Sequence, residues 1–118
     1  MEIKIIKGNI FTSGVQTLVN PVNTVGVMGA GLALEFKIRY PEMFNKYLDI
    51  CKNKQFRTGQ LWLYKADNRW ILNFPTKEHW KDDSKVEYIM EGLEKFINTY
   101  KIHNITSIAF PVLGTNKG

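Results

Sequence analysis

The sequence of 118 residues has only one cysteine, Cys51, and two histidines. A single cysteine excludes a disulfide within the chain and a cysteine-rich zinc site, and it fits a reducing compartment. Two histidines without acidic residues at ligand spacing also argue against zinc, so we expect no metal and no other cofactor. Cys51 lies in a predicted helix with no histidine beside it, which favours a small buried hydrophobe over a nucleophile.

The sequence also lacks a long hydrophobic run. Its first residues, 1–6, do not have the apolar core of a signal peptide, and no stretch approaches transmembrane length. Low-complexity segments and internal repeats are absent as well. These absences predict a cytoplasmic protein without a membrane partner, and the size predicts one domain, which we expect to be a monomer.

The chain is short for a complete α/β nucleotide-binding unit. Its last residues, 108–118, predict a buried strand that opens into a glycine-containing loop, and natural domains seldom stop inside such a loop. We therefore expect residues 1–118 to form a single domain that is truncated at its C-terminal end within this loop.

Acidic residues are fewer than basic ones, since eleven Asp and Glu stand against sixteen Lys and Arg, for a formal charge of +5. This excess attracts polyanions and favours a phosphate-rich partner over an acidic protein. It is also typical of a domain with one basic, solvated face, so composition leaves nucleic-acid binding open.

Hydrophobic periodicity predicts alternating strands and helices. In chain order these are a half-buried edge strand at 3–6, a strand covered on both faces at 15–22, a helix at 32–51 that breaks at Tyr40-Pro41, hairpin strands at 61–64 and 70–74, a helix at 84–100, and a buried strand at 105–112. This order is typical of an α/β domain with a mixed sheet and helices on its faces.

The helix at 84–100 has the clearest pattern. Its apolar residues recur at helical spacing and predict a face that packs in the core, made of Val86, Ile89, Met90, Leu93, Phe96 and Ile97. Ser84 and Glu87 have the spacing of a capping box, which predicts that the helix begins at Ser84.

The most informative stretch runs from Leu18 to Gly31, where an apolar strand ends in asparagines and enters a glycine-rich turn. Three glycines in six residues, Gly26, Gly29 and Gly31, let backbone N–H groups approach a bound anion, and the helix that follows adds a positive end. The spacing is neither the GxGxxG dinucleotide motif nor the P-loop motif. A nucleotide diphosphate is the ligand that we expect here.

Three unusual loops each follow a predicted strand, at 20–31, 73–80 and 114–118. In α/β sheets, ligands bind at the carboxyl ends of the strands. We therefore expect the three loops to converge on one pocket.

With these loops in view, the chain resembles the macrodomain family, whose members bind ADP-ribose. Four elements carry the resemblance in the family's order: Gly8-Asn9-Ile10, Val19-Asn20-Pro21-Val22-Asn23, the loop from Gly26 to Gly31, and the stretch from Pro111 to Gly118. The resemblance implies a three-layer α/β/α fold with a mixed central sheet, here lacking the family's last helix and strand.

Two stretches, 27–37 and 73–80, resemble the DarG-type antitoxin macrodomains, which remove ADP-ribose from thymidine bases in DNA. This resemblance implies ADP-ribosylated DNA as the substrate and a cognate toxin as a partner. A related lysine-using glycohydrolase removes ADP-ribose from protein carboxylates, and a reader that binds ADP-ribose without chemistry is a further alternative. The catalytic lysine of both enzymes corresponds to Lys77.

The catalytic candidates that the resemblance implies are Lys77, Asn23 and His79. A desolvated Lys77 can attack the anomeric carbon as a nucleophile, and a charged one can stabilise the departing group. Asn23 is expected at the distal ribose, where its amide can both donate to and accept from hydroxyls; the alternative is an Asx-turn that closes the strand. His79 can relay a proton, orient Lys77 or be structural.

The ADP-ribose site implied by the resemblance is larger. It comprises Asn9, Ile10, Asn20, Asn23, Val27, Met28, Gly29, Ala30, Gly31, Leu32, Thr76, Pro111, Leu113, Gly114, Thr115 and Asn116. Asn9 stands where the family has an aspartate, and its side-chain carbonyl can accept from the adenine amine. Backbone N–H groups of residues 29–31 are expected at the pyrophosphate, with residues 114–116 closing from the other side.

Four side chains are candidates for contacts with DNA. Trp80 can stack on a base or cap the core. Lys81, Arg69 and Lys85 can contact phosphates, although a solvated position is the alternative for each.

Overall fold

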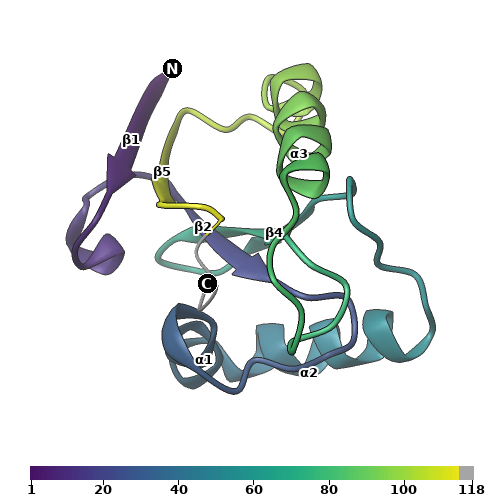
Figure 1. Ribbon diagram of the computed structural model, residues 1–118. Helices are drawn as coiled ribbons and strands as arrows, with labels where there is room; N and C mark the ends of the chain where they lie inside the picture. Colours follow the sequence, from purple (N-terminus) through teal and green to yellow (C-terminus); the bar gives the residue numbers. More distant parts are fainter. Residues whose placement is uncertain (115–118) are drawn as a thin grey trace.

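The computed structural model describes residues 1–114, which form three layers (Figure 1). A five-stranded sheet lies in the middle, with α1 and α2 on one face and α3 on the other. The elements are β1 (Glu2–Ile6), the 3-10 helix η1 (Ile10–Thr12), β2 (Thr17–Val22), α1 (Gly31–Arg39), α2 (Pro41–Lys52), β3 (Trp62–Lys65), β4 (Trp70–Pro75), α3 (Val86–Thr99) and β5 (Ser107–Pro111). The expected three-layer α/β/α fold is confirmed.

The sheet is mixed and has the strand order β1-β5-β2-β4-β3. β1, β5, β2 and β4 are parallel, whereas β3 pairs antiparallel with β4 as the predicted hairpin. Parallel strands end at a common edge, so β2 and β4 direct the loops that follow them to the same side of the molecule. This edge is where the sequence places its unusual loops.

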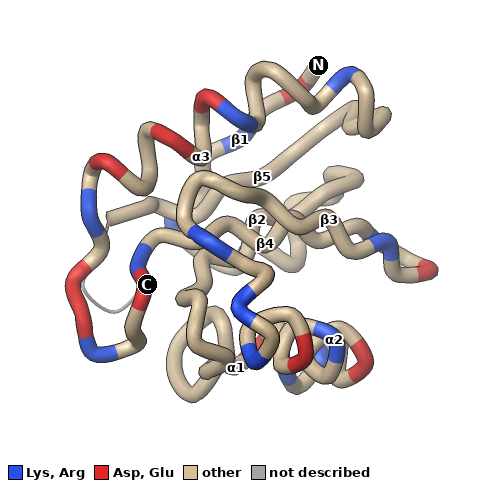
Figure 2. The backbone as a smooth tube through the Cα atoms, turned by 90° about the vertical axis from the view of Figure 1, so that its right-hand side faces the viewer, with Lys and Arg blue, Asp and Glu red and all other residues tan. Residues whose placement is uncertain are grey.

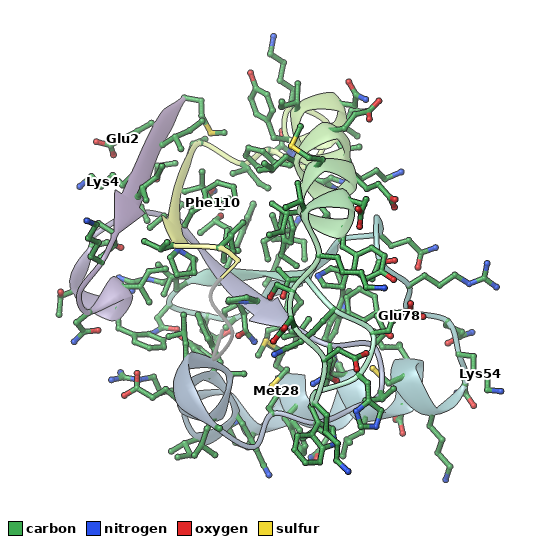
Figure 3. The ribbon with its side chains drawn as sticks, in the orientation of Figure 1. Glu2, Lys4, Met28, Lys54, Glu78 and Phe110 are labelled. Atoms are coloured by element: carbon green, nitrogen blue, oxygen red, sulfur yellow. The ribbon has the colours of Figure 1, made fainter. Side chains whose placement is uncertain are left out.

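β2 is central and buried along its whole length, as its apolar composition predicts for a strand covered on both faces. Leu18 and Val22 pack on the α1/α2 side, and Val19 packs on the α3 side. Figure 3 shows the same division through two labelled residues, since Met28 lies on the α1/α2 side of the sheet and Phe110 on the α3 side.

The predicted break at Tyr40-Pro41 separates α1 from α2. Pro41 is the first residue of α2, where its fixed φ suits a helix and its missing N–H removes no hydrogen bond. Met43, Tyr47 and Cys51 then recur every fourth residue, and all three are buried. This stripe fixes α2 against the sheet and brings Tyr47 beneath the loop that follows β2.

β1 forms at the predicted edge, but its exposed residues differ from the prediction. Ile3 and Ile5 are 57% and 73% exposed, while Lys4 is half-buried and donates to the carbonyl of Ser13 at 3.2 Å. β1 pairs only with β5 among the described strands, and in Figure 1 α3 lies over the opposite part of the sheet. Because α3 does not cover β1, Ile3 and Ile5 remain in solvent, whereas Ile6 is half-buried and packs against the core.

α3 begins at Val86 with Lys85 as its N-cap, and no side chain caps it. The capping box predicted for Ser84 and Glu87 is therefore wrong; the Ser84 hydroxyl lies 3.5 Å from that of Thr76 instead. The predicted core face is also only partly buried. Phe96 is buried and Ile89 and Leu93 are half-buried, but Val86, Met90 and Ile97 are exposed, because the stripe is wider than the surface of the sheet that α3 covers.

Candidate functional site

A cavity of about 530 Å³ opens at the carboxyl edge of β2 and β4. Its lining comes from the end of β2, the loop that follows, the start of α1 and the loop after β4, and comprises Pro21, Val22, Asn23, Val27, Gly29, Ala30, Gly31, Ala33, Lys77 and Trp80. This volume is typical of a small-molecule site. Two of the three predicted loops thus meet in one pocket.

Asn23 organises the loop between β2 and α1. Its Oδ1 accepts from the backbone N–H groups of Val25 at 3.1 Å and Val27 at 3.3 Å, and its Nδ2 donates to the carbonyl of Val27 at 2.7 Å. The Asx-turn that the sequence allowed is therefore present. Asn23 is 4% exposed and also lines the cavity, so the structural and the binding interpretations are compatible.

Tyr47 supports this loop from α2. Its hydroxyl lies 2.8 Å from both the backbone carbonyl and the Oδ1 of Asn23. Burial, and then the neighbouring Cys51 thiol, raise the pKa of Tyr47 well above its ordinary value of 10.0, so the phenol stays protonated and donates. Desolvation likewise raises the pKa of Cys51 to about 11.

Gly26 allows α2 to approach the loop closely. Its φ is +91°, a conformation that side chains rarely adopt, and a Cβ there would lie 3.4 Å from Leu48 and 3.6 Å from Cys51. The sequence signal of a glycine turn is thus explained here by packing against α2.

The start of α1 faces the cavity without a side-chain cap. Ala30 is the N-cap residue in extended conformation, and Gly31 begins the helix with a φ of +57°. The first N–H groups of a helix have no intrahelical partner, and together with the helix dipole they favour an anion. Because Gly29, Ala30 and Gly31 line the cavity, an anionic ligand fits at this end of it.

Lys77 brings a side-chain amine to the same cavity. It is 7% exposed and follows β4, two residues beyond Pro75. The loop that carries it is tied to β2 and its loop, because Thr76 N donates to Val22 O at 3.0 Å and both the amide and the hydroxyl of Thr24 donate to Glu78 O at 3.1 Å. These hydrogen bonds thus connect the loop that carries Lys77 to the loop that contains Asn23.

Trp80 forms the rim of the cavity, where it is 49% exposed. The His79 ring stacks on it with 5.7 Å between centroids, and Lys81 Nζ lies 5.2 Å from the centroid of a Trp80 ring. His79 Nδ1 accepts from Lys81 N at 3.2 Å, and His79 is not part of the lining. His79 therefore supports the rim in this structure.

Charges of both signs are mixed around the site. Figure 2 shows basic and acidic residues alternating along the segment that precedes α3, and both signs on α1 and α2. The segment carries Glu78, Asp82 and Asp83 beside Lys81 and Lys85. The rim near Trp80 is thus not a basic surface of the kind that binds phosphates through charge alone.

Other predicted ligand residues lie outside the lining. Asn9 caps η1, with its Oδ1 accepting from Phe11 N at 3.0 Å. Ile10 and Met28 lie in the hydrophobic core, and Leu32 packs against this core. Asn20 and Thr76 are buried. Pro111 is the last residue of β5, and Leu113 and Gly114 follow this strand. Thr115 and Asn116 lie outside the described residues.

Sequence reasoning missed Pro21, Val22 and Ala33 as lining residues. The first two lie within the asparagine motif at the end of β2, so the carboxyl-edge rule for α/β sheets could have included them. Ala33 lies in the first turn of α1, and a helix that begins at a cavity exposes its first turn to that cavity. The predicted anion site at the start of this helix could therefore have included Ala33.

Within residues 1–114, no cluster of three or more His, Cys, Asp or Glu side chains could hold a metal ion. Among the same residues, no helix has the length and apolar character needed to span a membrane.

Comparison with known proteins gives a consistent group of relatives. The family model described as Macro domain matches residues 19–118. A DNA ADP-ribosyl glycohydrolase of Thermus aquaticus is 40% identical over 120 residues, covering 98% of this chain and 33% of that protein. The chain thus spans about a third of the length of this curated relative.

Solved structures agree with this comparison. The macrodomain of Mycobacterium tuberculosis DarG superimposes with a TM-score of 0.91 at 42% identity, covering 98% of this chain and 80% of that one. Thermosipho africanus DarTG in complex with ADP-ribose superimposes with a TM-score of 0.88 at 38% identity, covering 96% of this chain and 33% of that one.

Proposed function

This chain belongs to the macrodomain family, and we propose that it binds ADP-ribose in the cavity and hydrolyses the bond that links ADP-ribose to DNA. Membership confirms the resemblance that the motifs indicated. The proposed substrate is supported by relatives named DNA ADP-ribosyl glycohydrolase and by a relative solved in complex with ADP-ribose.

One observation carries the proposal: the cavity combines an uncapped helix N-terminus with a buried lysine. The free N–H groups at residues 29–31 suit the pyrophosphate, whose charge is delocalised and needs donors from several directions. Lys77 lines the same cavity from the loop after β4, and we assign it to the distal end of the ligand. We thereby assign pyrophosphate binding to the start of α1 and bond cleavage to the loop after β4.

The reaction we propose breaks the bond between the anomeric carbon of the distal ribose and a nitrogen of the base. Water supplies the hydroxyl that the anomeric carbon gains and the proton that the base nitrogen gains. Lys77 can act in two ways: its neutral amine can attack the anomeric carbon before water displaces it, or its ammonium can stabilise the negative charge of the departing base. Both require Lys77 to lie in the cavity, as it does.

DNA as the attached group is supported by the rim. Trp80 is an exposed aromatic surface beside Lys77, and base–aromatic stacking is tolerant of sequence. Asp82 and Asp83 follow close in the chain, so stacking fits this rim better than phosphate contacts do. A cognate toxin partner and a cytoplasmic location remain predictions.

The test is release of ADP-ribose from a modified single-stranded oligonucleotide under single-turnover conditions. We expect Lys77→Ala to slow release by about 100-fold or more, the range of a positioned catalytic group, while isothermal titration still detects ADP-ribose binding. Release by Lys77→Ala at the parent rate would contradict the assignment of Lys77.

Two further comparisons separate the alternatives. Lys77→Arg keeps the positive charge but cannot attack, so recovered release identifies the electrostatic role and lost release identifies the nucleophile. Protein modified on carboxylates, assayed in parallel, tests the other glycohydrolase activity. A parent protein that binds both substrates and releases from neither is a reader.

A further inference from the structure

The hydrogen bonds of Asn23 limit what this side chain can offer a ligand. A carboxamide oxygen has two lone pairs, and Oδ1 already faces three donors: Val25 N, Val27 N and the hydroxyl of Tyr47. The acceptor is therefore saturated by the protein. Asn23 cannot use it for a ribose hydroxyl without giving up one of these contacts.

The other half of the amide is only partly used. Nδ2 has two hydrogens, and one of them is donated to Val27 O at 2.7 Å. The second remains for a group in the cavity, which Asn23 lines. In this arrangement Asn23 meets a ligand as a donor.

Tyr47 is the contact that comes from a different element. Val25 and Val27 belong to the loop itself and would move with it, whereas Tyr47 is on α2 and is fully buried. Its hydroxyl is 2.8 Å from both Oδ1 and the backbone oxygen of Asn23, so it fixes the side chain and the main chain together. Because burial raises its pKa, the phenol keeps the proton that this role needs.

Resting on the proposed function, we propose that Tyr47 is a positioning residue that holds the Asn23 amide with its oxygen toward the protein and an N–H toward the substrate. Tyr47 does not line the cavity, so it acts through Asn23. The group that Asn23 meets must then be an acceptor, such as a ribose oxygen. Loss of the Tyr47 hydroxyl leaves the Asn23 amide held only by Val25 and Val27 of its own loop. The amide and the loop can then shift together, so the donor is out of position in the cavity for part of the time.

The experiment is a double-mutant cycle with Tyr47→Phe, Asn23→Ala and the double variant. We expect Tyr47→Phe to slow single-turnover release about five- to tenfold, the typical value of one buried hydrogen bond, with the Kd for free ADP-ribose changed less than twofold. In the Asn23→Ala background, Tyr47→Phe should cause no further loss. Equal losses in both backgrounds, or no loss in either, would overturn the proposal.

A matched control is Tyr64→Phe, which removes a hydroxyl from a half-buried tyrosine on β3 outside the cavity lining. Release by this variant should equal that of the parent, and melting temperatures of all variants show whether each is folded during the assay. A loss in Tyr64→Phe as large as in Tyr47→Phe would mark a general effect of tyrosine hydroxyls on the fold and count against the proposal.

A spectroscopic measurement keeps the test independent of turnover. In ¹H–¹⁵N spectra of the parent, the two Nδ2 hydrogens of Asn23 should be separated more widely than those of exposed asparagines, because one is bonded to Val27 O. Tyr47→Phe should bring these signals toward those of exposed asparagines. If the parent releases no ADP-ribose, the proposed function fails, but this measurement still decides the role of Tyr47. Asn23 signals that are unchanged in Tyr47→Phe would refute that role.

Discussion

Asn20 and Asn23 lie three residues apart and have different surroundings. Asn20 is fully buried and donates from Nδ2 to Asn73 Oδ1 at 3.1 Å, its register partner on β4, while its own Oδ1 has no partner among the described residues. Asn23 lies one residue beyond β2 and reaches the cavity. Asn20 is therefore structural alone, because it lies within the buried strand, whereas Asn23 lies past the strand end and both closes the turn and lines the cavity.

At residue scale, Cys51 gives a prediction on pH. Its folded pKa is about 11 and its ordinary value is 9.0, so between these values the unfolded chain loses the thiol proton first and stability falls as pH rises. Below pH 9 the thiol should be alkylated about 100-fold more slowly in the folded protein than in urea.

Iodoacetamide kinetics followed by mass spectrometry measure this rate, and urea midpoints from pH 8 to 11 measure the stability. Cys51→Ala serves as the control, because the fall in its midpoint above pH 9 should be smaller. Equal alkylation rates in native buffer and urea would show that the thiol is accessible.

Single residues show where sequence reasoning succeeded and where it stopped. The strand-end rule for α/β sheets predicted that the loop at 73–80 reaches the cavity, while the choice of Lys77 within this loop came from the family resemblance. The saturation of Asn23 by Tyr47 was not, since the partners are 24 residues apart and nothing local in the sequence pairs them. Likewise, the use of Asn9 as a cap depends on η1, which has no strong pattern.

At the scale of elements, α3 meets β4 through a glycine. Gly92 is buried in α3, and a Cβ added there would overlap the ring of Phe74, which is itself fully buried. The helix axis can therefore lie closer to the sheet than a larger residue would permit. Phe74, Phe96 and Phe110 form edge-to-face pairs in this layer.

We predict that Gly92→Ala destabilises the protein by about 2 kcal/mol, because overpacking outweighs the helix propensity that alanine adds. Gly8→Ala is the matched control, since a Cβ at Gly8 would meet nothing within 4 Å, and its unfolding free energy should equal that of the parent. Urea denaturation measures both. A Gly92→Ala protein as stable as the parent would mean that α3 moves away from the sheet at little cost.

The elements differ in how far the sequence predicted them. β2, the α1–α2 break and the hairpin followed from composition and Pro41, because each depends on local residues. The exposure of Ile5 and the missing cap of α3 could not be predicted in this way. The first depends on which element covers β1, and the second depends on the contacts of the loop between β4 and α3. The periodicity of apolar residues predicts which face of a strand or helix is apolar, but the packing of the layers decides whether another element covers that face.

At the scale of the whole molecule, stability and ligand binding compete at the start of α1. Ala30 is an N-cap residue that contributes no side-chain hydrogen bond, and Ala is a poor cap compared with Asp or Ser. The uncapped end leaves N–H groups for an anion. The fold thus gives up about 1 kcal/mol of helix stability at the position where it lines the cavity.

We predict that Ala30→Asp raises the melting temperature of the free protein and removes its response to ADP-ribose, because the carboxylate caps α1 and repels the pyrophosphate. The parent should gain about 2.7 kcal/mol of stability at an ADP-ribose concentration 100 times the Kd. Thermal unfolding with and without ligand measures both effects. Ala30→Ser, a neutral cap, should retain part of the ligand response; a full response in Ala30→Asp would exclude an anion from this end of the cavity.

The position of β5 also constrains the order of assembly during synthesis. β5 lies between β1 and β2 in the sheet, and it pairs Glu2 with Ser107. β1 leaves the ribosome first, yet its only partner among the described strands is made last. The nascent chain must therefore carry β1 as an unpaired, isoleucine-rich edge until β5 has emerged, so the pairing of β1 is a late, long-range step of assembly.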